Sequence, residues 1–250
     1  MIRYILLITA MLCSGVSSAQ TADEIFAGFF KSTGDINVRK DLRSVKITGT
    51  APSPRGEFPI AIYSQRPNLL KVVLEIKGQE YIAQAYDGSV AWGLNPFQGD
   101  GKAEKLPETQ AADIAKDANF DDSYVFSRFT NYKEKGYTVS LEGREDVNGK
   151  ECYKVKFSNS KNNGKQGPVE YYYFDTRTNY LTRYTLSVVT EDGKWEKHEL
   201  FDDYKDVKPG LKMPYSSEVR FNDKVVRKLF AKNIVVNENF DAKVFAYPLQ

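Results

Sequence analysis

With 250 residues, the chain has room for one large domain or two small ones. Its 35 Lys and Arg residues nearly balance 33 Asp and Glu residues, which argues against a nucleic-acid-binding protein. An aromatic content of 13% excludes a largely disordered chain. One histidine and two cysteines exclude histidine-rich zinc sites and a disulfide scaffold.

Residues 1–19 have the pattern of a signal peptide. Arg3 gives a positive start, Tyr4–Leu12 is a short apolar run, and Ser17–Ala19 supplies small residues for cleavage. We expect cleavage near Ala19, a single domain over residues 20–250, and export to the periplasm. Lipidation of Cys13 is the competing interpretation, although Leu12 stands where a lipobox needs a small residue.

The first half of the remaining chain predicts one helix followed by strands. Thr21 and Glu24 have the spacing of a capping box, and Gly34 is placed to end the helix that follows them. From about residue 45 to residue 99, apolar and polar residues alternate with a period of two, as in half-buried strands. Asp87-Gly88 indicates a hairpin turn among them.

The segment Lys102–Lys135 changes character. Helix-forming residues replace the alternation, and Pro107 suits the first turn of a helix. A second short helix is predicted over Ser123–Tyr132. Because strands lie on both sides of this segment, it is expected to cover the sheet rather than form a separate domain.

After Gly136 the strand pattern returns, with turn signals at Asn148-Gly149, Asn163-Gly164 and Asp192-Gly193. The whole pattern predicts a mainly β fold of about eleven antiparallel strands in one meander. A sheet of that length must curl or close into a barrel.

The sequence contains no recognisable catalytic constellation. It lacks the G-x-S-x-G, H-E-x-x-H, P-loop and G-x-G-x-x-G motifs. Asp121-Asp122 and Asp202-Asp203 are adjacent pairs whose side chains diverge on a strand, and His198 and Cys152 each fit a structural role. We therefore predict no catalytic residue, metal site or cofactor, and a protein that is not an enzyme.

Three short motifs occur in order in the first half of the chain. They are Arg66-Pro67-Asn68-Leu69-Leu70, then Tyr86-Asp87-Gly88-Ser89-Val90-Ala91-Trp92, then Asn95-Pro96-Phe97. This combination resembles the periplasmic lipoprotein carrier LolA and its superfamily, which includes LolB and RseB. The chain departs from the family pattern at Leu70, where the family often has Phe, and in the detail of Lys102–Lys135.

The resemblance implies an incomplete antiparallel β-barrel with a lid of short helices over an apolar concave face. It also implies a carrier that takes the acyl chains of lipoproteins from inner-membrane release machinery to an outer-membrane acceptor. Arg66 corresponds to the family arginine that fastens the lid by hydrogen bonds to the lid backbone.

The alternating strands give candidates for lipid-binding residues on the inner face, and the segment Lys102–Lys135 gives candidates on the lid. An inner apolar groove favours acyl-chain binding, because each buried CH₂ contributes about 0.8 kcal/mol. The same residues are also compatible with a filled core. The candidates are Ile60, Ile62, Leu70, Val72, Leu74, Trp92, Leu94, Ile114 and Phe126.

The prediction from sequence is thus a monomeric periplasmic carrier of lipoprotein acyl chains or other lipid. One alternative is a sensory or regulatory lipid-binding module of the same fold that reports to a membrane partner. Another is an exported hydrolase that would depend on His198 or Cys152.

Overall fold

A computed structural model describes residues 20–123, 128–159, 168–190 and 193–248 of the chain. The predicted signal peptide, the lid candidate Phe126 and the predicted turn at Asn163-Gly164 lie outside these ranges. No helix within the described ranges is long and apolar enough to cross a membrane.

The first helix forms where its capping signals place it. In α1 (Ala22–Thr33) the Thr21 hydroxyl accepts from the backbone N–H of Glu24, and the Glu24 carboxylate accepts from the backbone N–H of Thr21. Both contacts satisfy N–H groups that a helix start leaves without partners. Gly34 follows with a φ of 130°, a conformation that favours glycine. A short helix that the sequence did not signal, α2 (Ile36–Lys40), comes next.

Over the described residues, thirteen strands form one antiparallel sheet that does not close. They are β1 (Ser44–Ser53), β2 (Gly56–Gln65), β3 (Leu69–Ile76), β4 (Gln79–Tyr86), β5 (Ala91–Leu94), β6 (Ala103–Lys105), β7 (Tyr137–Val147), β8 (Lys150–Asn159), β9 (Val169–Asp175), β10 (Leu181–Thr190), β11 (Gly193–Lys208), β12 (Leu211–Phe221) and β13 (Lys224–Val236). The mainly β class and the incomplete barrel predicted from sequence are confirmed.

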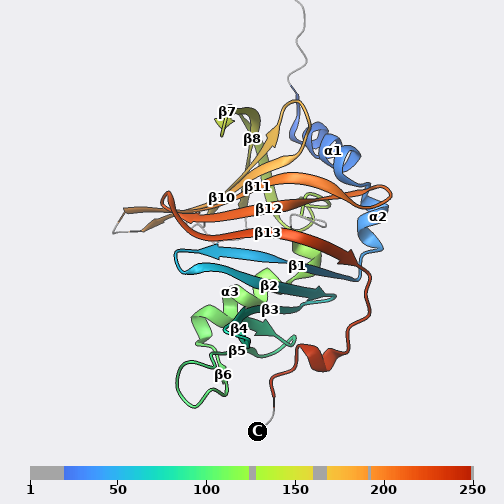
Figure 1. Ribbon diagram of the computed structural model, residues 1–250. Helices are drawn as coiled ribbons and strands as arrows, with labels where there is room; N and C mark the ends of the chain where they lie inside the picture. Colours follow the sequence, from blue (N-terminus) through green and yellow to red (C-terminus); the bar gives the residue numbers. More distant parts are fainter. Residues whose placement is uncertain (1–19, 124–127, 160–167, 191–192, 249–250) are drawn as a thin grey trace, which may run out of the picture.

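The strand order differs from the single meander that we expected. It runs β6-β5-β4-β3-β2-β1-β13-β12-β11-β10-β9-β8-β7, so the first strand pairs with the last one (Figure 1). The sheet edges are therefore β6 and β7, which are consecutive in the chain. The connection between them has to pass from one edge of the sheet to the other. It contains α3 (Glu108–Ala118) and the 3₁₀ turn η1 (Phe120–Asp122).

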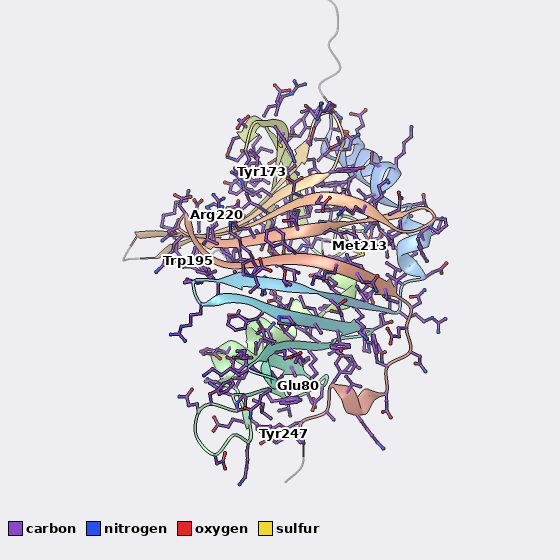
Figure 2. The ribbon with its side chains drawn as sticks, in the orientation of Figure 1. Glu80, Tyr173, Trp195, Met213, Arg220 and Tyr247 are labelled. Carbon is purple, nitrogen blue, oxygen red and sulfur yellow. The ribbon has the colours of Figure 1, made fainter. Side chains whose placement is uncertain are left out.

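Different helices lie against the two halves of the sheet. Figure 1 shows α1 and α2 beside the upper half, formed by β7–β13, and α3 against the lower half, formed by β1–β6. The C-terminal segment leaves β13, passes through η2 (Ala242–Val244) and runs down to the lower end. Figure 2 shows Tyr247 of that segment at the end of the sheet away from Tyr173 of β9.

Within Lys102–Lys135 the structure corrects two expectations. Ala103–Lys105 forms the edge strand β6 instead of joining the helical region. The predicted helix over Ser123–Tyr132 is wrong in its described part, because residues 128–132 form turns and a bend. Phe129 and Tyr132 are both buried there, so tertiary packing rather than helical periodicity places their side chains.

Candidate functional site

An apolar cluster lies between α3 and the inner face of β1–β5. The register pairs Ile60 with Leu74 and Ile62 with Val72, so alternate residues of β2 and β3 share one face. We call this group the α3-covered cluster. Its buried members are Ala51, Ile60, Leu70, Val72, Ala91, Ile114 and Ala118, with Ile62, Leu74, Ala83, Tyr86, Leu106, Ala111 and Leu229 packed against them.

The cover over this cluster is attached by few side chains. Of the eleven residues of α3, only Ile114 and Ala118 are buried. Pro107 precedes the helix and makes no side-chain capping hydrogen bond. Beneath the helix, Ile62 and Leu74 remain half-buried. A helix with two buried anchors loses little apolar contact when it lifts, so α3 is suited to act as a movable cover.

A cavity of about 430 Å³ opens beside this cluster at the β4–β6 end of the sheet. That volume is within the range of small-molecule sites. Ala83 and Leu106 line the cavity and also pack against the α3-covered cluster, so the two adjoin each other. The polar residues Asn95, Gln98, Lys102 and Glu104 line it as well. The cavity is thus open to solvent beside the α3-covered cluster and has a lining of mixed polar and apolar residues.

Arg66 connects the sheet to the segment that follows α3. Its Nε donates to the Leu42 carbonyl oxygen at 2.5 Å, and its guanidinium forms an ion pair with Asp121. The guanidinium also lies 4.9 Å from the ring centroid of Phe120. Next to it, the Phe120 N–H donates to the Pro67 carbonyl oxygen at 3.2 Å. Arg66 therefore contacts the η1 turn through side chains, whereas the resemblance implied hydrogen bonds to the lid backbone.

An ionic cluster lies at the same, C-terminal end of α3. The buried Arg128 pairs with the buried Glu170 of β9, and its Nη1 donates to the Asp122 carboxylate at 2.7 Å. The Tyr172 hydroxyl donates to Glu170 at 2.7 Å. Lys116 of α3 lies 3.8 Å from the same carboxylate. Burial opposes the charged form of Arg128, but the surrounding anionic groups outweigh it and raise the pKa of the guanidinium.

Beyond the ionic cluster, an aromatic cluster fills the upper half of the inner face under α1. The Phe129 ring lies 5.0 Å from both the Phe26 ring and the Tyr172 ring, measured between centroids. Phe157 and Phe174 are also fully enclosed there. A cavity of only about 10 Å³ borders this cluster near Arg39. This half of the face is a packed core of the ordinary kind.

The structure brings together most of the sequence-derived candidates, but not all of them. Ile60, Ile62, Leu70, Val72, Leu74 and Ile114 meet in the α3-covered cluster. Trp92 and Leu94 lie on the opposite face, in a separate cluster with Val73, Ile82, Ala85 and Ala103. There the Trp92 indole donates to the Phe245 carbonyl oxygen at 2.9 Å. Leu94 nevertheless lines the 430 Å³ cavity.

The residues considered for catalysis have structural partners. The Cys152 sulfur lies 3.2 Å from the Thr182 hydroxyl, and burial raises the pKa of the thiol. His198 Nδ1 lies 2.9 Å from the Thr185 hydroxyl. Among the described residues, no three His, Cys, Asp or Glu side chains are placed to hold a metal ion.

Sequence reasoning missed the ionic cluster. Glu170 had one detectable signal, because it occupies an inward position in the alternation with Tyr172 and Phe174 on β9. A carboxylate at such a position needs a buried cation as a partner. That partner, Arg128, comes from a segment whose sequence pattern predicts a helix.

Searches against family models and against curated proteins found no match. Comparison with solved structures found the same fold in proteins of low identity. A LolA superfamily protein from Nitrosomonas europaea is 14% identical, with a TM-score of 0.53 over 91% of this chain and 98% of that one. A domain from Vibrio parahaemolyticus assigned to outer membrane lipoprotein sorting is 10% identical, with a TM-score of 0.55 over 89% and 95% of the two chains.

A third solved structure is a DUF1329 family protein from Desulfovibrio piger. It is 13% identical, with a TM-score of 0.56 over 89% of this chain and 97% of that one. The chain therefore has a LolA-like fold along most of its length.

Proposed function

We propose that this chain is a monomeric periplasmic carrier, not an enzyme, that binds a lipoprotein acyl chain between α3 and the inner face of β1–β5. The observation that supports this function is the small number of buried α3 residues over an apolar surface that adjoins an open cavity. The likeness in fold to a domain assigned to lipoprotein sorting agrees with it.

The energetics favour exchange rather than permanent binding. An acyl chain of ~16 carbons gains on the order of 10 kcal/mol from full burial before ordering costs. Cargo and the apolar side of α3 compete for the same surface, so closing the cover weakens cargo binding. A carrier needs this competition, because it has to accept cargo from release machinery at the inner membrane and give it up to an acceptor at the outer membrane.

The direct test is mass spectrometry of lipid extracted from the gently purified mature protein. Co-purified acyl lipid, together with release of a lipoprotein from inner-membrane preparations, supports the carrier. Absence of both, with tight binding to a membrane signalling protein instead, would favour the sensory alternative.

A matched pair of substitutions tests the location of the site. Ile62 is half-buried on the inner face, whereas Thr48 is half-buried on the outer face of the neighbouring strand. Ile62→Trp should fill space beneath α3 and weaken the binding of a fluorescent fatty acid. Thr48→Trp adds the same side chain to the other face and should leave binding unchanged. Equal effects of the two substitutions would refute the assigned location.

A further inference from the structure

The inner face of the sheet is interrupted by charge between its two apolar regions. Glu170 on β9 lies opposite Phe157 of β8 and Leu186 of β10, within an inward-facing row. On one side, Tyr172 belongs to the aromatic cluster while its hydroxyl bonds to Glu170. On the other side, Lys116 reaches Glu170 from α3, between the two anchors of the α3-covered cluster.

These charges resist displacement by an apolar ligand. Arg128 is 3% exposed and Glu170 is 7% exposed, so neither group has water as an alternative partner. Arg128 Nε donates to the Tyr172 hydroxyl at 3.1 Å, and the guanidinium lies 4.5 Å from the ring centroid of Tyr137. Separating Arg128 from Glu170 would leave a buried charge without compensation, which is strongly unfavourable. An acyl chain gains nothing comparable by entering at that point.

Two adjacent residues of the connection between β6 and β7, Asp121 and Asp122, are therefore held differently. Asp121, on the η1 turn, is mostly exposed where it meets Arg66. The ionic cluster holds Asp122, Arg128 and Lys135 against the sheet, with Lys135 Nζ 3.3 Å from Asp122. Lifting α3 exposes the α3-covered cluster while the residues after Arg128 stay on the aromatic cluster.

We infer that the Arg128–Glu170 ionic cluster is the end wall of the acyl-chain site and sets the longest chain that the site buries. This inference rests on the proposed function and makes it more specific. Cargo would enter by the 430 Å³ cavity, extend under α3 and stop at Glu170. The aromatic cluster would take no part in binding.

A series of saturated fatty acids from about 8 to about 18 carbons tests the wall, with affinity measured by displacement of a fluorescent probe. In the unmodified protein we expect affinity to rise about fourfold per added CH₂ and then to stop rising at a defined length. The double variant Arg128→Met with Glu170→Gln removes both charges together and keeps a hydrogen-bonding partner for Tyr172. The chain length at which affinity stops rising should then increase by at least about two CH₂ groups, which makes the longest chains bind about 15-fold more tightly.

The control removes an ion pair of similar chemistry on the other face. Arg183 donates to Glu145 at 2.5 Å. The double variant Arg183→Met with Glu145→Gln should not change the chain length at which affinity stops rising. If the Arg128–Glu170 double variant does not change this limiting chain length, the inference of an end wall is overturned and the carrier function stands. No binding at any chain length would overturn the carrier function and, with it, this inference.

Photocrosslinking of the unmodified protein tests the same inference without relying on a variant that folds. A long fatty acid with a diazirine at its terminal carbon should label peptides that contain Lys116, Asp122 or Glu170. Labelling of Phe26 or Phe29 of α1, which belong to the aromatic cluster, would show that the chain passes the wall.

Discussion

Removing the Arg66 side chain should make the protein hold its cargo more tightly. Arg66 joins the sheet to η1 through Asp121 and Phe120, and these contacts favour the closed position of α3. The Arg66 side chain is 26% exposed and that of Asp121 is 58% exposed, so their ion pair contributes about 0.2–1 kcal/mol. The stacking on Phe120 contributes about 0.5–1 kcal/mol. Arg66→Leu should therefore destabilise the closed position by about 1–2 kcal/mol.

Since the closed position of α3 competes with cargo, destabilising that position makes the protein bind cargo more tightly. A change of about 1–2 kcal/mol corresponds to a fall in Kd of about 5-fold to 30-fold, mostly through slower dissociation. The assay is stopped-flow release of a fluorescent fatty acid into acceptor vesicles, with equilibrium titration for Kd. Transfer of a lipoprotein to its acceptor should slow in parallel.

Two further variants separate charge from apolarity. Arg66→Gln adds no apolar surface and should act in the same direction as Arg66→Leu. Asp121→Ala removes the ion pair but keeps Arg66 beside Phe120, so it should produce a smaller change. It should add little to Arg66→Leu, because both substitutions break the same ion pair. Unchanged release rates in a folded Arg66→Leu protein, or faster release, would refute the role of Arg66 in holding the cover.

Three predictions concern stability. Burial lowers the pKa of His198, the only histidine in the chain, so the free energy of unfolding should decline as pH falls through about 6.5 and level off below the folded-state pKa. NMR titration of the imidazole and urea unfolding between about pH 5 and 8 check this. A His198→Gln protein whose free energy of unfolding has the same pH dependence would contradict it. Phe129→Ala should lower the free energy of unfolding, measured in urea, by about 3–5 kcal/mol, because the ring is 3% exposed. Phe97→Ala, at a 50% exposed position, should change it by no more than about 0.5 kcal/mol. Similar losses for the two variants would argue against the aromatic cluster as a packed core. Gly49→Ala should cost about 3 kcal/mol or more, because its Cβ would meet the Phe230 carbonyl oxygen at 2.1 Å; a lowered thermal midpoint is the expected readout, and an unchanged one would contradict the close approach of β1 and β13.

Local signals in the sequence predicted the elements that local chemistry decides. The capping box of Thr21 and Glu24 formed, and so did the turn after Tyr86, where the Asp87 carboxylate accepts from the backbone N–H groups of Ser89 and Val90. The alternation in β2 and β3 also placed Ile60 and Val72 on one face as expected. In each case the partners lie within a few residues or on adjacent strands.

Long-range packing decided what the sequence could not reveal. Trp92 and Leu94 alternate like inner-face residues, but the C-terminal segment covers the outer face of β5, so apolar residues there are buried as well. The partner of Trp92 is 153 positions away in the chain. In the same way, nothing near Arg128 in the sequence indicated Glu170, 42 positions later, as its partner.

The pairing of β1 with β13 has a consequence for how the molecule is made. β13, which joins the two halves, is synthesised after the other described strands, so every shorter length of chain leaves the edges of β1 and β12 unpaired. Bare edges of this kind recruit other strands. The chain would need protection of these edges until β13 is complete, and truncation within β13 should yield aggregates instead of a smaller working protein.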